Sequence, residues 1–115
     1  MQTATTQSWN LTEPEIMEIT GRLDSGTAPS MEEDGRTRIQ SGARELVLDC
    51  GKLHSVTAAG LRAILALARD MRAMRGQFAV CNLQPQVKEM FEACSFDQII
   101  PVYDNQDEAV TKLAA

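Results

Sequence analysis

Apolar residues along the chain form short contiguous runs that alternate with longer stretches of helical spacing. Residues 45–50 include three consecutive aliphatic residues, which is typical of a strand covered on both faces. Residues 77–82 form a second run of this kind, and residues 15–20 mix charged and apolar positions as a strand does. Residues 99–103 predict a short edge strand, because Pro101 has no N–H to donate to a ladder.

Four stretches have the spacing of helices. The central one follows Thr57, whose hydroxyl can accept a hydrogen bond from a first-turn N–H, and runs to about Arg75, with Gly76 suited to the position beyond its end. Its predicted apolar stripe comprises Leu61, Ile64, Leu65, Ala68 and Met71. The other helices are predicted over residues 28–40, from Pro85 through Val87, Met90, Phe91 and Cys94, and from Asp104-Asn105 to Leu113 with Ala109 and Val110 inward.

The first of these helices is weak by its own composition. Ser25 or Thr27 can cap it and Pro29 suits its first turn. Gly35 lies in its middle, and a glycine there costs about 1 kcal/mol relative to alanine. Packing against the rest of the molecule must therefore stabilise it.

The start of the chain predicts one further strand. Residues 3–9 read as an edge strand, and the turn residues at 10–14 join it to residues 15–20 as an opening hairpin. The predicted order is ββαβαβαβα, an α/β fold with a mixed sheet of about five strands and about four helices. The length of 115 residues suits a single domain over residues 1–115.

The composition limits which partners and which cellular location are expected for this domain. A formal net charge of −5 argues against a phosphate-binding surface, and hence against direct nucleic-acid binding. No apolar run approaches the ~20 residues of a membrane span, and residues 1–6 lack the features of a signal peptide. We therefore expect a cytoplasmic protein without a membrane span.

The residues that could take part in catalysis do not form a recognisable active-site motif. The sequence contains no P-loop, no GxGxxG after a strand and no GxSxG elbow. His54 is the only histidine and has no evident nucleophile as partner, while Asp24 is expected to cap a turn and Asp49 to end a strand. The three cysteines, Cys50, Cys81 and Cys94, lack CxxC spacing and are expected to be small buried residues. We expect no metal, no cofactor and no enzymatic activity.

The segment Thr57-Ala58-Ala59-Gly60-Leu61-Arg62 resembles the central motif of the STAS domain, the fold of anti-sigma factor antagonists. Gly21-Arg22-Leu23-Asp24 is similar to a turn that precedes the first helix in that family. Residues 87–97 and the ending at residues 101–109 also resemble STAS proteins, although Ser95 stands where glycine is common. A flavodoxin-like receiver or a thioredoxin would need an acidic cluster or a CxxC pair, and both patterns are missing.

The resemblance implies a protein that works by partner switching. In the family, the domain docks without phosphate on a Ser/Thr kinase-type anti-sigma factor, the kinase phosphorylates the motif serine, and a phosphatase restores binding. The serine position falls on Ala58 here, through an engineered replacement or a natural loss, and Thr57 is the candidate substitute acceptor. We expect the domain to be a monomer or a weak dimer. The resemblance places partner binding on Arg22, Asp24, Ser25, Thr27, His54, Ser55, Val56, Thr57, Ala58, Ala59, Gly60 and Arg62.

A second function stays open at this point. Some STAS domains are subunits of ABC-type lipid-transport complexes, where they bind the ATPase, and a motif without the usual serine resembles that type. Others are cytoplasmic parts of anion transporters, which the missing membrane segment disfavours.

Overall fold

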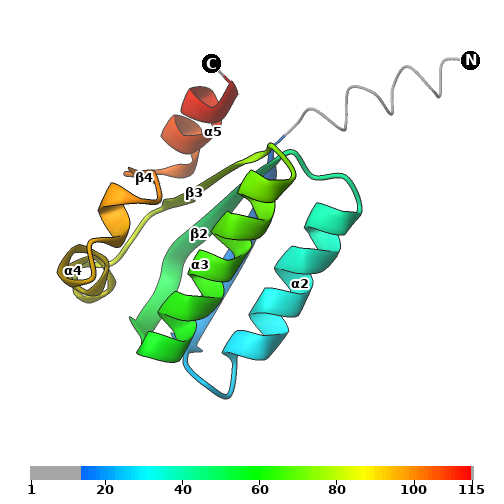
Figure 1. The fold of residues 1–115 in the computed structure, drawn as a ribbon. Helices are drawn as coiled ribbons and strands as arrows, with labels where there is room; N and C mark the ends of the chain where they lie inside the picture. Colours follow the sequence, from blue (N-terminus) through cyan, green and yellow to red (C-terminus); the bar gives the residue numbers. More distant parts are fainter. Residues whose placement is uncertain (1–13, 115) are drawn as a thin grey trace, which may run out of the picture.

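The computed structural model describes residues 14–114, which form a four-stranded sheet with helices on its two faces (Figure 1). Helices α2 and α3 lie side by side on one face, and α5 packs on the other. Within the described residues, no helix is long and apolar enough to cross a membrane. The elements are β1 (Glu15–Leu23), α2 (Ala28–Gln40), β2 (Glu45–Val56), α3 (Ala58–Ala73), β3 (Gln77–Cys81), α4 (Pro85–Ala93), the 3₁₀ helix η1 (Phe96–Gln98), β4 (Val102–Tyr103) and α5 (Gln106–Ala114).

The strands lie in the order β1-β2-β3-β4, and all three neighbouring pairs are parallel. The predicted α/β alternation is confirmed, with four described strands rather than about five. The strand predicted at residues 3–9, on which the mixed character of the sheet depended, lies outside the described residues. As predicted, the last strand is at an edge, although only Val102 and Tyr103 pair in it.

Strand β2 is twice as long as the apolar run that predicts it. The prediction ended the strand at Cys50, whereas β2 continues to Val56 and pairs with the second half of β1. Two irregularities in the register of β1, one beside Gly21 with its φ of 79°, keep the strands paired. His54, Ser55 and Val56 are therefore strand residues, and the predicted loop at this place is wrong.

Alternate residues of the sheet enter two separate cores. In β2, Leu46, Leu48 and Cys50 face α2 and α3, whereas Val47 packs with Ala109 of α5. All four of these side chains from β2 are fully buried. The prediction that this run is covered on both faces is confirmed.

Helix α3 buries a slightly different stripe from the one predicted. Leu61, Ile64 and Met71 are buried as expected, but Leu65 and Ala68 are half-exposed and Leu67 takes their place in the core. The same rotation applies to α4, where Val87 and Phe91 are buried while Met90 and Cys94 are exposed. Helical spacing alone allows either neighbouring stripe, and the position of the sheet selects one.

The residues at the end of α3 and at the start of α5 test two predictions about helix ends. The left-handed residue after α3 is Arg75 (φ 62°), not Gly76 as predicted. Gly76 instead permits close approach, because a Cβ there would lie 2.6 Å from the carbonyl oxygen of Arg44. At the start of α5, the Glu108 N–H donates to the Asn105 side chain over 2.8 Å, so the predicted asparagine cap is confirmed.

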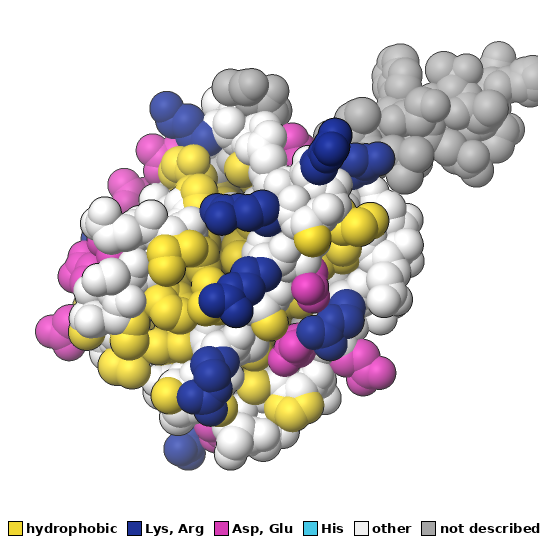
Figure 2. Space-filling model, in the orientation of Figure 1, with side chains coloured by type: hydrophobic (Ala, Val, Ile, Leu, Met, Phe, Trp, Pro, Cys, Tyr) yellow, Lys and Arg dark blue, Asp and Glu magenta, His cyan; other side chains and the backbone are white. Residues whose placement is uncertain are grey.

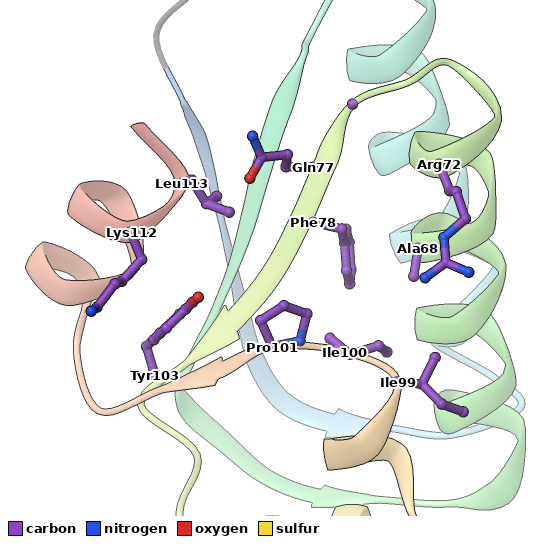
Figure 3. A pocket seen from close by; sticks show the side chains of 11 residues that line it. Ala68, Arg72, Gln77, Phe78, Ile99, Ile100, Pro101, Tyr103, Lys112 and Leu113 are labelled. Atoms are coloured by element: carbon purple, nitrogen blue, oxygen red, sulfur yellow. The ribbon is translucent and has the colours of Figure 1, made fainter. Parts of the chain in front are cut away.

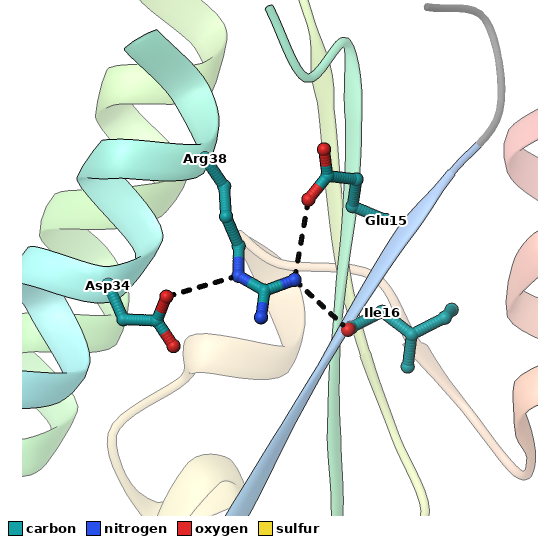
Figure 4. A network of polar contacts seen from close by, with 4 residues as sticks. All are labelled: Glu15, Ile16, Asp34 and Arg38. Atoms are coloured by element: carbon teal, nitrogen blue, oxygen red, sulfur yellow. Dashed lines mark hydrogen bonds and ion pairs between the residues drawn. The ribbon is translucent and has the colours of Figure 1, made fainter. Parts of the chain in front are cut away.

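Arg38 joins α2 to the beginning of β1 (Figure 4). Its guanidinium donates to Asp34 Oδ1 at 3.2 Å, to Glu15 Oε1 at 3.3 Å and to the Ile16 carbonyl oxygen at 3.3 Å. One arginine thus fixes the helix against the edge strand.

Candidate protein-binding site

The two segments that carry the motif residues meet at the carboxyl ends of β1 and β2. Arg22 is paired with Ser55 and Leu23 with Val56 in the parallel register. The Thr57 N–H then donates to the Leu23 carbonyl oxygen over 3.0 Å. The β1–α2 turn and the start of α3 therefore form one continuous surface, which we call the junction and define as residues 22–27 and 54–62.

The β1–α2 turn is ordered by its own side chains. The Asp24 carboxylate accepts hydrogen bonds from the Gly26 N–H at 3.0 Å and the Thr27 N–H at 3.2 Å, and these two bonds hold the pKa of Asp24 below its ordinary value. The Thr27 hydroxyl donates to the Arg22 carbonyl oxygen over 2.8 Å. Thr27 occupies the N-cap position of α2 without a side-chain cap bond, so the predicted capping by Thr27 is replaced by bonds within the turn.

Thr57 is the N-cap residue of α3, as predicted. Its backbone is extended and its hydroxyl accepts a hydrogen bond from the Gly60 N–H at 3.5 Å. The same hydroxyl lies 3.4 Å from the Leu23 carbonyl oxygen, to which it donates. The oxygen of Thr57 is thus engaged on both sides by the junction itself.

Gly60 is required by the packing of the junction. A Cβ at this position would lie 2.5 Å from the carbonyl oxygen of Leu23 and 2.8 Å from Cγ2 of Val56. Both atoms are held in place by the sheet, so they cannot easily move aside. The Ala-Gly-Leu motif therefore has a structural cause: α3 begins directly against the end of β1.

The predicted binding residues differ in what they can contact. Ala58 is the first residue of α3 and is exposed, while Ala59 is half-buried. Val56 and Gly60 are buried, so they can shape the surface but not contact a partner through a side chain. His54 is exposed at the side of the junction near α4, where its carbonyl oxygen accepts a hydrogen bond from Gln86. Asp24 is half-buried, and the other exposed members are Arg22, Ser25, Thr27, Ser55, Thr57 and Arg62.

A groove of about 390 Å³ between the first turns of α2 and α3 extends this surface. Ala28 and Ala63 are buried at its base, and Arg62 and Glu32 stand at its edge. Glu32 and Ala66 line this groove but are not among the binding residues predicted from the sequence. The alanines at 59, 63 and 66 repeat at helical spacing, and that small-residue face is the signal that could have found the groove.

No group of three or more potential metal ligands occurs within residues 14–114. Burial raises the pKa of Cys50 to about 12 and that of Cys81 to about 11, so both thiols stay protonated at neutral pH. Both are buried as predicted, whereas Cys94 is exposed at the end of α4.

Comparison with known proteins agrees with this geometry. The STAS domain family model matches residues 10–109. A Bordetella bronchiseptica protein assigned as anti-sigma factor antagonist BtrV is 34% identical over 91 residues, covering 79% of this chain and 78% of that protein. The anti-sigma F factor antagonist of Paenibacillus polymyxa is 29% identical and covers 85% of each chain. The crystal structure of an anti-sigma factor antagonist from Mycobacterium paratuberculosis superposes with a TM-score of 0.81 at 22% identity, covering 89% of this chain and 86% of that one.

Proposed function

This chain belongs to the STAS domain family, and from that premise we propose that it is a regulatory binding protein of the anti-sigma factor antagonist type. In its unphosphorylated form it docks through the junction on a Ser/Thr kinase-type anti-sigma factor in the cytoplasm. In family members that carry the phosphoacceptor serine, a cognate phosphatase restores the unphosphorylated form. The domain itself carries out no chemical reaction, and it binds no nucleic acid directly.

One observation supports this proposal above the others: Ala58 is exposed at the first position of α3, in the middle of the junction. The phosphoacceptor serine of the family falls on this position. A serine hydroxyl here would be open to a kinase, and a phosphate would stand at the positive end of the α3 dipole. Phosphorylation would therefore add about −1.5 to −2 charges to a docking surface without unfolding the helix.

With alanine at this position, the domain is expected to stay in its binding-competent form. An engineered replacement and a natural loss of the serine lead to the same physical state. Thr57 is a poor substitute acceptor, because its hydroxyl already donates to the Leu23 carbonyl oxygen and accepts from the Gly60 N–H. Phosphorylation of Thr57 would break both contacts, so Ala58 makes the protein a constitutive binder.

The test uses Ala58→Ser and Ala58→Glu with the purified kinase-type anti-sigma factor from the same organism. We expect the parent protein to bind and to take up no phosphate, and Ala58→Ser to take up phosphate from ATP and then dissociate. Ala58→Glu should bind more weakly, by about 1 kcal/mol at a wet rim and by several kcal/mol if the charge is buried. Calorimetry measures the binding, and thermal denaturation shows whether the variants stay folded.

Ala93→Glu is the matched control, because Ala93 is an exposed helix residue outside the junction. It adds the same charge and should leave binding unchanged. The proposal fails if Ala58→Ser accepts no phosphate from the kinase and Ala58→Glu binds as tightly as the parent.

The missing hydroxyl at Ala58 also favours a second candidate. A STAS subunit of an ABC-type lipid-transport complex would bind the ATPase of that complex through the same surface and would need no phosphoacceptor. Purification of the tagged protein from its own cells distinguishes the two: recovery of the ATPase in place of a kinase would assign the domain to lipid transport.

A further inference from the structure

A second surface lies on the outer flank of α3, away from the junction (Figure 3). It consists of two adjoining cavities of about 270 and 210 Å³, which share Ala68, Arg72 and Ile99 in their walls. We call the two together the flank groove. Helix α3 forms one side of it, and the segment from Ile99 through Tyr103 with the end of α5 forms the other.

The floor of the flank groove is apolar. Phe78 of β3 and Ile100 are buried beneath it, and Leu65 and Ala68 of α3 are half-exposed along its side. Ile99 is 48% exposed, although it is a large aliphatic residue. An apolar strip bordered by polar groups marks a place where another molecule can be held.

The rim of the flank groove is basic. Arg69 and Arg72 of α3 stand on one side and Lys112 of α5 on the other, and neither cavity has an acidic residue in its lining. No ion pair within residues 14–114 involves any of these three cations. Figure 2 shows basic side chains in a row beside the hydrophobic surface of this face. A chain with a net charge of −5 thus presents a local positive field around an apolar strip.

From this combination we propose that the flank groove binds an acidic amphipathic helix of a partner protein. Aliphatic side chains on one face of such a helix fill the strip over Ala68 and Ile99, and carboxylates on its flanks pair with Arg69, Arg72 and Lys112. Three cations are fewer than the four to eight of typical lipid-binding clusters. The chain's net negative charge also opposes nucleic acid.

The flank groove is a different site from the junction. Arg69 follows Ala58 by eleven positions in α3, which corresponds to roughly 16 Å along the helix axis. The flank groove therefore shares no residue with the junction, and the inference does not depend on the proposed function.

The experiment titrates a synthetic helical peptide into the isotope-labelled full chain and follows backbone amide shifts. The peptide has about 18 residues, or five turns, with Leu on one face and Glu on the flanks, and a second peptide carries Lys in place of Glu. We expect shifts in residues 65–72 and 99–103 with the Glu peptide, and at least tenfold weaker binding of the Lys peptide.

A charge reversal supplies the decisive comparison. Arg69→Glu/Arg72→Glu should lower the affinity for the Glu peptide by about tenfold or more and raise the affinity for the Lys peptide. Arg44→Glu/Lys88→Glu changes the net charge equally at two exposed sites outside the groove, and should bind like the parent. The proposal is overturned if both double variants behave alike, or if no shifts arise in these segments. Two other occupants would equally overturn it, and each is tested with the parent and the Arg69→Glu/Arg72→Glu variant. Co-sedimentation shows whether the groove binds phosphatidylglycerol vesicles. Analytical ultracentrifugation shows whether it binds a second copy of the chain.

Discussion

Asp49 is the buried charged residue of the described chain, with 7% of its surface exposed. Its carboxylate accepts hydrogen bonds from the Gly51 N–H at 3.0 Å, from Asn82 Nδ2 at 3.1 Å and from Gln106 Nε2 at 2.6 Å. Burial alone would raise the pKa of Asp49, but these donors outweigh it, so the pKa lies below its ordinary value of 3.8. One side chain thereby connects β2, the residue that follows β3, and α5.

Asp49 should make the stability of the protein depend on pH in acid. Because its pKa is lowered in the folded state, its contribution is complete above the ordinary value and is lost as pH falls through the lowered value. Asp49→Asn should reduce the free energy of unfolding by about 2 kcal/mol at pH 7, with the difference shrinking below about pH 4. Urea denaturation at a series of pH values measures this.

Asp97→Asn serves as the control, since Asp97 is exposed in η1. It should change stability little at any pH. A constant difference between Asp49→Asn and the parent from pH 7 down to pH 2 would contradict the account.

The prediction that Asp49 ends a strand is wrong, because β2 continues to Val56 and Asp49 lies in its interior. The contacts of Asp49 were not predicted either. Its donor Gln106 is 57 residues away in the chain, and its donor Asn82 is 33 residues away. Local patterns find caps such as Thr57 and Asn105, whose partners lie within a few residues. Networks that close only after folding are outside their reach.

At the scale of elements, Gly35 has a role in the structure that its helix propensity does not indicate. In the sequence it weakens a helix. In the structure it allows α2 to approach α3, because a Cβ there would lie 2.5 Å from Cδ1 of the fully buried Leu67. The cost in helix propensity is offset by close packing of the two helices that cover β1 and β2.

Gly35→Ala should therefore be destabilising although alanine is the better helix former. The gain of about 1 kcal/mol in propensity is outweighed by about 2 kcal/mol of overpacking. Leu67→Val should cost about 1 kcal/mol alone, but should relieve the clash in the double variant. Chemical denaturation of the parent, the two single variants and the double variant should give a coupling free energy between the two positions of at least about 1 kcal/mol.

Thr37→Ala combined with Leu67→Val is the matched pair, since Thr37 is an exposed residue of the same helix. Those two changes should add without coupling. Additivity for Gly35 and Leu67 as well would show that the helices tolerate the extra methyl group.

The sequence predicted element types better than element ends. Helix α2 begins and ends where its capping and glycine signals predict, and α4 begins at Pro85. Strand β2 extends past its apolar run because β1 pairs with its second half, and β4 shortens because only two residues reach β3. Both differences come from partner strands, which one-dimensional patterns do not contain.

At the scale of the whole molecule, β2 separates two cores of unequal size. The larger core contains the buried faces of α2, α3 and α4. The smaller one has five buried residues, of which Ala109 and Leu113 belong to α5. The junction lies over the larger core, so its geometry depends on α2 and α3 and not on the C-terminal helix.

This division predicts that the C-terminal part can open while the junction stays closed. Helix α5 is held by the small core and by the hydrogen bond from Gln106 to the Asp49 carboxylate. Gln106→Ala removes that bond, and a hydrogen bond to a charged group contributes about 1.5–3 kcal/mol. Amide hydrogen exchange in α5 should then be about tenfold faster or more, while α2 and α3 exchange as in the parent.

Gln98→Ala removes an equally exposed glutamine in η1 that makes no side-chain bond to Asp49, and it should leave exchange in α5 unchanged. The informative comparison is between α5 and the junction in the Gln106 variant. Equal acceleration in α5, α2 and α3 would mean that the molecule opens as one unit, and that the two cores are not separable. Acceleration confined to α5 would mean that the proposed binding surface at the start of α3 rests on an independently stable half of the sheet. A partner docked there would then protect α2 and α3 from exchange without slowing α5.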